Sequence, residues 1–376
     1  MKKVAFWLWL SGKYRNGRTV NRLLEEFGSP EAVFRAGGKT LEKIEWLRPE
    51  DREKLLDKDL SETEEIRAVS DRKGIRILCY SDPDYPAPLR VIPDPPLVLY
   101  AVGKIPDFAT ILPIAVVGTR NASFYGRNVA ENLGNRLSAA GAYVITGMAS
   151  GIDASASRGA LKAGNQNAVI LGTAIDKPYP QSSRDIYDAL RTEGLILSEY
   201  APGEKSHPGN FPERNRIISG LSRGVVVVEA PKKSGALITA RLALEQGRDV
   251  FAVPGNIDVP SFEGSNRLLA DGEAKAILNV RDVLSEYEWQ FERTLPLSEA
   301  EKSLHEKSEE PAPALPGAGE GGEIEEKILR VLGTGGLSAE EIQEKTGIPA
   351  ADMQTGLTMM ELVGKIKSDG GRYYPV

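Results

Sequence analysis

The stretch IAVVGTRNASFYG, residues 114–126, decides the fold class of this 376-residue chain. It opens on a continuous apolar run and passes through a glycine-containing loop into a more polar segment. A continuous apolar run is typical of a strand that is covered on both faces, as parallel strands are. The stretch therefore predicts a strand, a loop and the start of a helix, which together make the first unit of an α/β domain.

The same alternation continues along the chain. Amphipathic segments separate further apolar runs, which are YVIT (143–146), AVIL (168–171), LILS (195–198), VVVV (225–228) and VFAV (250–253). Strands that alternate with helices predict a parallel sheet with helices on both faces. Residues 111–290 are therefore expected to form a doubly wound α/β sheet.

The regions before the sheet differ in character. Residues 1–73 carry apolar side chains at helical spacing and predict a small helical domain, in which Ser29 and Pro30 begin one helix. Prolines interrupt residues 74–110, which keep two short extended pieces, IRILCY and LVLYAVG. These pieces are expected to lead into the sheet, so that residues 74–297 form one domain.

The C-terminal part predicts a linker and a third domain. Residues 298–322 are rich in Pro, Gly and Glu and predict a flexible acidic linker. Residues 323–376 predict three helices, at 323–332, 338–346 and 349–363, followed by a hairpin at Asp369-Gly370. Ser338 and Glu341 have the spacing of a capping box. Three helices and a hairpin predict a winged helix.

Composition excludes several classes of protein. A net charge of −6 argues against a wholly basic nucleic-acid coat and leaves room for a local basic cleft. Cys79 is the one cysteine, and His207 and His305 are the only histidines, so neither a disulfide nor a Cys/His metal centre is expected. No apolar run reaches about 18 residues, and the apolar start meets Lys13 and Arg15 rather than a cleavage site. We expect a cytoplasmic protein with no membrane span, metal or cofactor.

Small residues, arginines and amides follow the predicted strands. Parallel sheets bind ligands at the carboxyl ends of their strands. Glycines there let backbone N–H groups approach an anion, helix N-termini add partial positive charge, and arginines add forked donors. The sequence therefore predicts a phosphate-binding cleft. Its candidate residues are Gly118, Thr119, Arg120, Gly147, Met148, Ala149, Ser150, Gly151, Asp153, Gly172, Lys177, Arg214, Asn215, Arg216, Ser234 and Gly235.

Each of these loops also has a plainer interpretation. A single glycine serves equally in a strand-to-helix turn, and Asp153 serves equally as a helix N-cap. Common nucleotide and hydrolase motifs are absent. The chain has no G-x-G-x-x-G after its first parallel strand, no P-loop and no G-x-S-x-G elbow, so neither NAD binding nor those enzyme classes are expected.

Several long motifs resemble the DNA-processing protein A (DprA/Smf) family and stand in the expected order. They are VGTRNASFYG, TGMASGIDASASRGAL, LILSEYAPG, FPERNRIISGLS, VVVVEAPKKSGALITARLALEQGRDVFAVPG and EGSNRLLADG. The resemblance covers roughly residues 80–290. It implies an extended Rossmann-like sheet, preceded by a SAM-like helical domain and followed by a winged-helix domain.

The resemblance also implies a function. Members of the family are not enzymes; they bind single-stranded DNA in the cleft, form homodimers and load the RecA recombinase onto incoming DNA during natural transformation. The subunit contact then falls on the segment with Leu268, Leu269 and Ile277, residues that equally well cover the sheet. Carried over by motif, the DNA contacts fall on Arg120, Gly147–Gly151, Arg214, Arg216 and Ser234–Leu237, with Lys177 as a weaker candidate.

The chain departs from the family pattern in places, and one alternative stays open. Ser157 stands where the family often has a histidine, and the helix expected at 349–363 carries no Lys or Arg, which favours protein contact or packing. The alternative is a nucleoside monophosphate phosphoribohydrolase, an enzyme of the related Rossmann-like class. Such enzymes carry a PGGxGT-like loop with a glutamate, where this chain has APKKSGALITA (230–240). Glu229 is the nearest acid and is expected to end a strand.

Overall fold

The computed structural model describes residues 2–15, 17–164, 167–291, 321–332, 336–362, 364–369 and 371–375. These residues form two compact units, one that ends at Phe291 and one that begins at Gly321. The predicted linker at 298–322 lies outside the described residues, apart from Gly321 and Gly322 at the start of the second unit.

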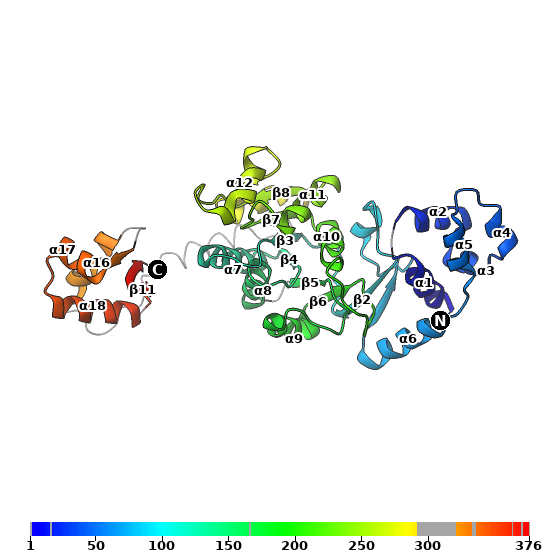
Figure 1. Cartoon of the computed structure of the whole chain (residues 1–376), viewed down its shortest axis with the longest axis horizontal. Helices are drawn as coiled ribbons and strands as arrows, with labels where there is room; N and C mark the ends of the chain where they lie inside the picture. The colour runs from blue at the N-terminus through cyan, green and yellow to red at the C-terminus, as the bar shows by residue number, and fades with distance from the viewer. Residues whose placement is uncertain are drawn as a thin grey trace. The chain divides into compact units, whose positions relative to one another are not determined.

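A nine-stranded sheet forms the centre of the first unit (Figure 1). In spatial order its strands are β1 (Arg76–Cys79), β2 (Val98–Gly103), β6 (Leu195–Ser198), β5 (Asn167–Leu171), β4 (Tyr143–Thr146), β3 (Pro113–Val117), β7 (Gly224–Val227), β8 (Asp249–Ala252) and β9 (Lys275–Ala276). All neighbours from β6 to β9 are parallel. The chain runs outward from β3 to β6 and then continues on the other side of β3 with β7. This reversal confirms the predicted doubly wound sheet and places its switch point between β3 and β7.

Strands β1 and β2 add an antiparallel edge to the sheet. They pair with each other, and β2 pairs antiparallel with β6. The proline-rich segment between them includes the short 3₁₀-helix η1 (Ala87–Val91) and buries Tyr85, whose hydroxyl donates to the carbonyl oxygen of Pro96 at 2.7 Å. The extended pieces seen in the sequence are therefore strands of the same sheet.

Helices cover both faces of the sheet, because successive strand residues point in opposite directions. In β3, Ala115 and Val117 pack beneath α10 (Asn210–Leu221) and α11 (Gly235–Glu245). Ile114 and Val116 pack beneath α7 (Phe124–Ala139) and α8 (Ile152–Ala163). After the short η2 (Gln181–Ser183), α9 (Arg184–Glu193) packs against β2 and β6.

Helices α7 and α8 approach each other closely through glycines. A Cβ on Gly134 of α7 would lie inside contact distance of the carbonyl oxygen of Ala156 in α8. A Cβ on Gly159 of α8 would do the same to the carbonyl oxygen of Glu131 in α7. Asn135 donates its side-chain amide to the carbonyl oxygen of Gly159 at 3.3 Å. The two backbones therefore meet where neither helix carries a side chain.

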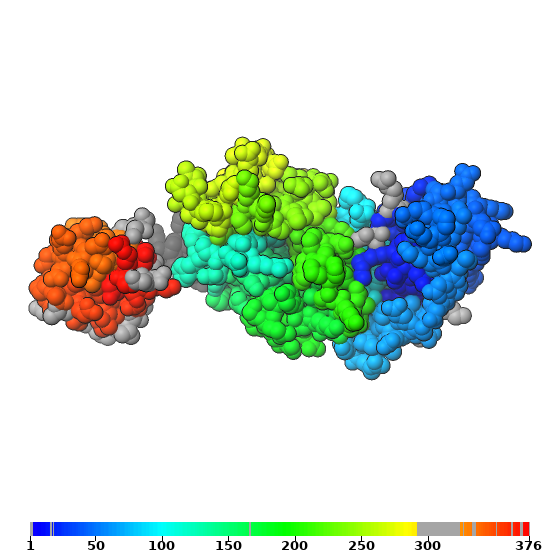
Figure 2. Space-filling model, in the orientation of Figure 1, coloured from blue at the N-terminus to red at the C-terminus, as the bar shows by residue number. Residues whose placement is uncertain are grey.

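The N-terminal residues form helices, as the sequence predicts. They are α1 (Lys2–Lys13), α2 (Arg18–Phe27), α3 (Pro30–Arg35), α4 (Gly38–Glu42), α5 (Pro49–Leu56) and α6 (Ser61–Lys73). Ser29 caps α3 as expected, because its hydroxyl accepts the N–H of Ala32 at 3.2 Å. Leu8 and Leu10 share one core with Val98 and Tyr100 of the sheet edge. Figure 2 shows the blue helical domain joined to the cyan and green surface of the sheet domain.

Leu268, Leu269 and Ile277, the residues expected at a subunit contact, lie at the end of the first unit. The elements here are η3 (Pro260–Phe262), α12 (Glu263–Ala270), α13 (Arg281–Leu284) and α14 (Glu288–Phe291). Leu268 and Ile277 are 7% and 2% exposed, and Leu269 packs half-buried against the core of Leu268. These side chains cover the sheet and offer little surface to a second subunit. The neighbouring Leu278 is 87% exposed.

The second unit is the predicted winged helix. Its elements are α16 (Gly321–Leu332), β10 (Leu337–Ser338), α17 (Ala339–Thr346), α18 (Ala350–Leu362), β11 (Ile366–Asp369) and β12 (Arg372–Pro375), and its sheet order is β10-β12-β11. The capping box of Ser338 and Glu341 is present. In α18, Met360 is buried in the core and Met359 is 54% exposed. Among the described residues, no helix is both long and apolar enough to cross a membrane.

Candidate functional site

A cleft of about 570 Å³ opens at the switch point of the sheet. Loops that follow β3 and β7 line the cleft, together with residues of α10. The β3 loop contributes Arg120 and Asn121, and the β7 loop contributes Lys233, Ser234 and Gly235. Arg120 and Lys233 are exposed at the surface, so the cleft presents two cationic side chains to solvent.

The loop that carries Arg120 is fixed by Glu229. Glu229 is fully buried, and its carboxylate accepts the backbone N–H of Ser123 at 3.0 Å and the hydroxyl of Ser123 at 2.8 Å. Its carbonyl oxygen accepts the N–H of Thr119 at 2.7 Å. Ser123 is the N-cap of α7, so the carboxylate also neutralises the positive end of that helix. Glu229 follows β7, as expected of a residue that ends a strand, and both of its oxygens point into this loop.

Two aromatic rings line the cleft beside Arg120. The ring centroids of Tyr179 and Phe211 lie 5.7 Å apart, and the Arg120 guanidinium carbon lies 5.1 Å from the Phe211 centroid. Tyr179 is 52% exposed. Gly172 lies behind Phe211, since a Cβ there would be 2.8 Å from the ring. Gly172 therefore makes room for the ring.

Tyr179 and Phe211 were not among the residues predicted from the sequence. Tyr179 stands in the loop after β5, close to Lys177, and Phe211 is the second residue of α10, close to Arg214. Aromatic residues interleaved with basic ones are typical of surfaces that stack nucleic-acid bases. That composition was the available signal, but nothing in the sequence indicates that these two rings from separate segments lie side by side.

In the glycine loop at 147–151, the backbone N–H groups of Gly147 and Met148 already donate to acceptors within the protein. The N–H of Gly147 donates to the Asp153 carboxylate at 2.9 Å, and the N–H of Met148 donates to the Thr146 hydroxyl at 3.2 Å. Met148 is fully buried and holds a left-handed backbone angle, φ 57°. The prediction that Gly147 and Met148 offer donors to a ligand is not supported by these contacts. Among the described residues, the N–H groups of Ser150 and Gly151 meet no protein acceptor.

Gly151 is required where the glycine loop crosses the Arg120 loop. Its φ of +76° lies in the left-handed region, and a Cβ would run into the carbonyl oxygens of Thr119 and Arg120. Ala149 lines the main cleft, while Ser150 lines a small hollow that continues beneath Tyr179 and Phe211. The loop therefore serves to bring the cleft walls together.

Arg214 forms part of the cleft floor. It is 4% exposed, and one guanidinium nitrogen donates to the carbonyl oxygen of Gly147 at 2.8 Å and to that of Ile170. Burial lowers the pKa of Arg214 to about 10, and the nearby Asp153 carboxylate opposes that change. Burial raises the pKa of Asp153, against the attraction of Arg214. Arg214 and Asp153 thus form a buried, mutually compensating pair at the base of the cleft.

Arg216, which was also predicted to contact a ligand, does not line the cleft. It is 7% exposed, and its guanidinium donates to the Glu199 carboxylate at 2.7 Å inside the protein. Burial raises the pKa of Glu199, and Arg216 opposes that rise. Residues two apart on a helix point about 200° away from each other, so Arg214 and Arg216 cannot share one surface.

The remaining candidates divide between the cleft and its surroundings. Lys177 does not line the cleft, because its amine donates to the carbonyl oxygens of Gly203 and Glu204 at 2.8 and 3.2 Å. Asn215 does line it and donates to the carbonyl oxygen of Gly235 at 3.3 Å. Ser234 caps α11 with its hydroxyl. Ser234 and Gly235 both line the cleft, so the positive end of this helix lies at the cleft. The cleft also includes Gly118 and Thr119 of the β3 loop.

The fold and this cleft define a Rossmann-like α/β protein with a ligand cleft at its switch point, followed by a winged helix. A family model described as DNA recombination-mediator protein A matches residues 76–288, and a DprA winged helix domain model matches residues 308–372. The chain therefore belongs to the DNA recombination-mediator protein A family, which confirms the resemblance found in the sequence.

Curated proteins and solved structures agree with this assignment. Protein Smf of Synechocystis is 31% identical over 98% of this chain and 98% of its own length. DNA processing protein DprA of Bacillus subtilis is 39% identical over 59% of this chain and 74% of its own length. The structure of DNA processing protein A from Streptococcus pneumoniae matches with a TM-score of 0.64 at 32% identity, over 74% of this chain and 96% of that one. The Helicobacter pylori protein matches with a TM-score of 0.52 at 29% identity, over 57% and 96%, and its structure describes a single-stranded DNA binding mode.

Proposed function

We propose that the cleft at the switch point binds single-stranded DNA and that the protein is a non-enzymatic recombination mediator. The observation that carries this proposal is the placement of Arg120 beside the ring of Phe211 and its neighbour Tyr179. A nucleotide in a single strand offers a phosphate and an unpaired base side by side. A guanidinium next to a partly exposed aromatic pair matches both groups at once.

The cleft is suited to many sequences rather than to one. Base stacking on an aromatic ring tolerates all four bases, because each base has a π-face. The phosphate donors in reach are the Arg120 guanidinium, the exposed Lys233 and the N-terminus of α11 at Ser234 and Gly235. These donors contact the backbone and carry no base information. We therefore infer sequence-independent binding, as a mediator of recombination requires.

The partners of the mediator follow from the family. Membership supports a role in DNA processing and recombination, and the Helicobacter pylori relative is described by its single-stranded DNA binding. We propose that this chain holds incoming single strands during natural transformation and passes them to the RecA recombinase. A strand-exchange assay with RecA and a single-strand-binding protein tests this step, and wild-type protein should shorten the lag before exchange.

The first prediction concerns Arg120. Arg120→Ala is expected to weaken binding of a single-stranded oligonucleotide about tenfold, because it removes a charge-assisted contact with a phosphate. The slope of log K against log salt should become shallower by about 0.7, the value for one phosphate on a single strand. Fluorescence anisotropy across a salt titration measures both quantities. Affinity and slope that stay at the wild-type values would remove Arg120 from the site.

Two further variants separate charge from stacking. Phe211→Ala should weaken binding without changing the salt slope, because the ring carries no charge. Arg184→Ala is the matched control, since Arg184 is an exposed arginine on α9 that pairs with Asp188 and does not line the cleft. It should change neither affinity nor slope. A loss on Arg184→Ala equal to that on Arg120→Ala would show a general charge effect.

The second prediction concerns self-association, which we propose on the basis of the family and of one exposed side chain. Leu278 is 87% exposed beside β9, and β9 pairs on one side only among the described strands. An open sheet edge next to an exposed leucine is suited to a second copy of the chain. Sedimentation at tens of micromolar should show a dimer, and Leu278→Asp should raise the dissociation constant about tenfold.

The control for this dimer is Ile257→Asp. Ile257 is 88% exposed on the loop after β8, so it matches Leu278 in exposure at another place in the unit. The dimer should persist in this variant. A wild-type protein that sediments as a monomer, or two variants with the same effect, would place any subunit contact away from Leu278.

A further inference from the structure

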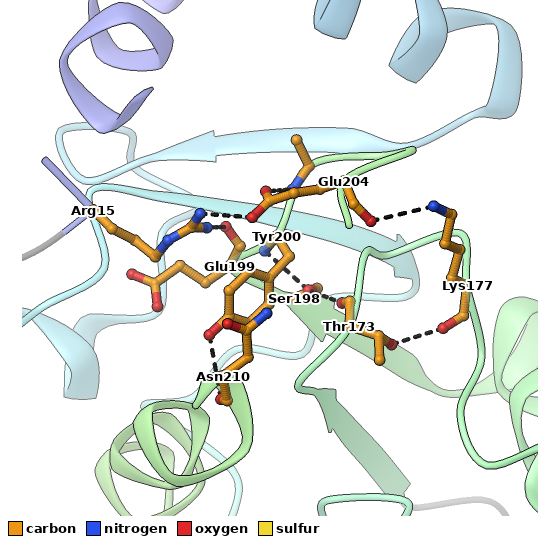
Figure 3. A network of polar contacts seen from close by, with 9 residues as sticks. Arg15, Thr173, Lys177, Ser198, Glu199, Tyr200, Glu204 and Asn210 are labelled. Atoms are coloured by element: carbon orange, nitrogen blue, oxygen red, sulfur yellow. Dashed lines mark hydrogen bonds and ion pairs between the residues drawn. The ribbon is translucent and has the colours of Figure 1, made fainter. Parts of the chain in front are cut away.

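A polar network joins the N-terminal domain to the loop between β6 and α10 (Figure 3). Arg15, just after α1, is the residue that the N-terminal domain contributes to this network. Its guanidinium donates to the carbonyl oxygen of Glu199 at 3.0 Å and to the Glu204 carboxylate at 2.6 Å, and its central carbon lies 4.5 Å from the ring centroid of Tyr200. A hydrogen bond, an ion pair and a stacking contact therefore hold one side chain in one orientation.

The loop that Arg15 contacts is itself tied together. The Glu204 carboxylate accepts the N–H of Ala201 at 3.0 Å, so the same acid binds Arg15 and closes the turn. Lys177 donates to the carbonyl oxygens of Gly203 and Glu204 from the other side. Residues 199–204 thus form a compact turn with Arg15 on one flank and Lys177 on the other, as Figure 3 shows.

Tyr200 connects this turn to the cleft. Its ring lies against Arg15, and its hydroxyl donates to the carbonyl oxygen of Asn210 at 3.2 Å. Asn210 is the first residue of α10, and the next residue is Phe211, whose ring lines the cleft. Tyr200 is 1% exposed, so it has little freedom to move independently of these two contacts. One aromatic side chain therefore links Arg15 to the start of the helix that carries Phe211.

We propose that Arg15 is a positioning residue for the DNA cleft. It fixes the turn at 199–204 and, through Tyr200, holds the first turn of α10 so that Phe211 is ready to stack on a base. Arg15 makes its contacts with the protein and none with DNA. The N-terminal domain then serves binding by preorganising the cleft, which lowers the cost of ordering the loop when DNA binds. This inference rests on the proposed single-stranded DNA function.

The test begins with wild-type protein and then compares Arg15→Ala with Arg22→Ala. Arg22 is the matched control, because it belongs to the same domain and stacks on Trp46 at 4.1 Å without contact to the turn at 199–204. Arg15→Ala should weaken binding of a single-stranded oligonucleotide about three- to tenfold through lost preorganisation. The salt slope should stay unchanged because no phosphate contact is lost. Arg22→Ala should bind as wild type does.

A double-variant comparison separates positioning from general destabilisation. In a Phe211→Ala background, Arg15→Ala should have almost no further effect on affinity, since the group that Arg15 positions is gone. Additive losses would overturn the proposal, and so would a slope that changes by about 0.7, because that would mark a direct phosphate contact. Arg15→Lys keeps the positive charge toward Glu204 but loses the forked, stacked geometry. Its affinity for the oligonucleotide should therefore lie between those of wild type and Arg15→Ala.

Hydrogen–deuterium exchange of the full chain without DNA gives an independent measurement. Arg15→Ala should raise deuterium uptake in peptides that cover residues 201–211 and leave peptides of β3 and β7 unchanged. Uptake at wild-type level in 201–211 would overturn the proposal. This experiment needs no DNA, so it stays informative if wild-type protein fails to bind oligonucleotides. That failure would reject the proposed function rather than the structural link.

Discussion

Glu199→Ala is expected to lower the free energy of unfolding of the first unit by about 3–5 kcal/mol. The change leaves the Arg216 guanidinium inside the protein without its counter-charge, since Arg216 is 7% exposed and Glu199 is 2% exposed. The contact also leaves polar atoms of both side chains without hydrogen bonds. Within the described residues, one oxygen of Glu199 and two nitrogens of Arg216 have no hydrogen-bond partner. The variant therefore loses the ion pair that offsets the lost hydration of the Arg216 guanidinium.

Two comparison variants test this expectation. Urea denaturation of each protein measures its free energy of unfolding. Glu204→Ala removes an acid whose side chain is 29% exposed, and it should cost no more than about 1 kcal/mol. The double variant Glu199→Met with Arg216→Met removes both charges and should recover most of the loss, because apolar side chains of similar size often replace a buried pair without penalty. If the double variant is as unstable as Glu199→Ala, the loss of stability comes from packing and not from the unpaired charge.

Gly134→Ala is expected to destabilise the first unit by about 2–3 kcal/mol. In an ordinary helix the same change stabilises by roughly 0.5–1 kcal/mol, because alanine loses less backbone freedom than glycine does. Here the added methyl group meets the carbonyl oxygen of Ala156, and helix backbones yield less readily than side chains. The clash outweighs the propensity gain and pushes α7 and α8 apart.

Gly12→Ala is the control that shows whether a Gly→Ala change without a clash leaves the protein as stable or makes it more stable. Gly12 is also a helical glycine, in α1, and a Cβ there meets nothing within 4 Å. Its replacement should leave stability unchanged or raise it by up to about 1 kcal/mol. Thermal unfolding of both variants under one set of conditions provides the comparison. Equal effects from Gly134→Ala and Gly12→Ala would show that the close approach of α7 and α8 is relaxed in solution.

Much of the fold could be predicted because its strands are short, apolar and regularly spaced. The apolar runs locate β3 to β8 to within a residue or so, since a strand buried on both faces leaves an unbroken pattern. The antiparallel edge could not be predicted in the same way. Prolines between β1 and β2 suggest an irregular segment, and only tertiary contacts such as the burial of Tyr85 show that the flanking pieces join the sheet.

The candidate site could be predicted in outline and not in detail. Loops after β3 and β7 had to meet once the sheet was doubly wound, and Arg120, Ser234 and Gly235 do line one cleft. The pair Arg214 and Arg216 could not be assigned from residue type. Both are arginines in one motif, and only the orientation of α10 determines which one faces the cleft floor and which one faces Glu199.

Arg214 has a consequence for the electrostatic potential at the base of the cleft. The carbonyl oxygens of Gly147 and Ile170 lie close together at the base of the cleft, and the buried Asp153 carboxylate lies near them. Left alone, this surface would repel a polyanion. The Arg214 guanidinium spans the carbonyl oxygens of Gly147 and Ile170 at the ends of two neighbouring strands and offsets the nearby acid. We therefore expect Arg214 to make the potential at the base of the cleft less negative, which favours the approach of a phosphate toward Arg120.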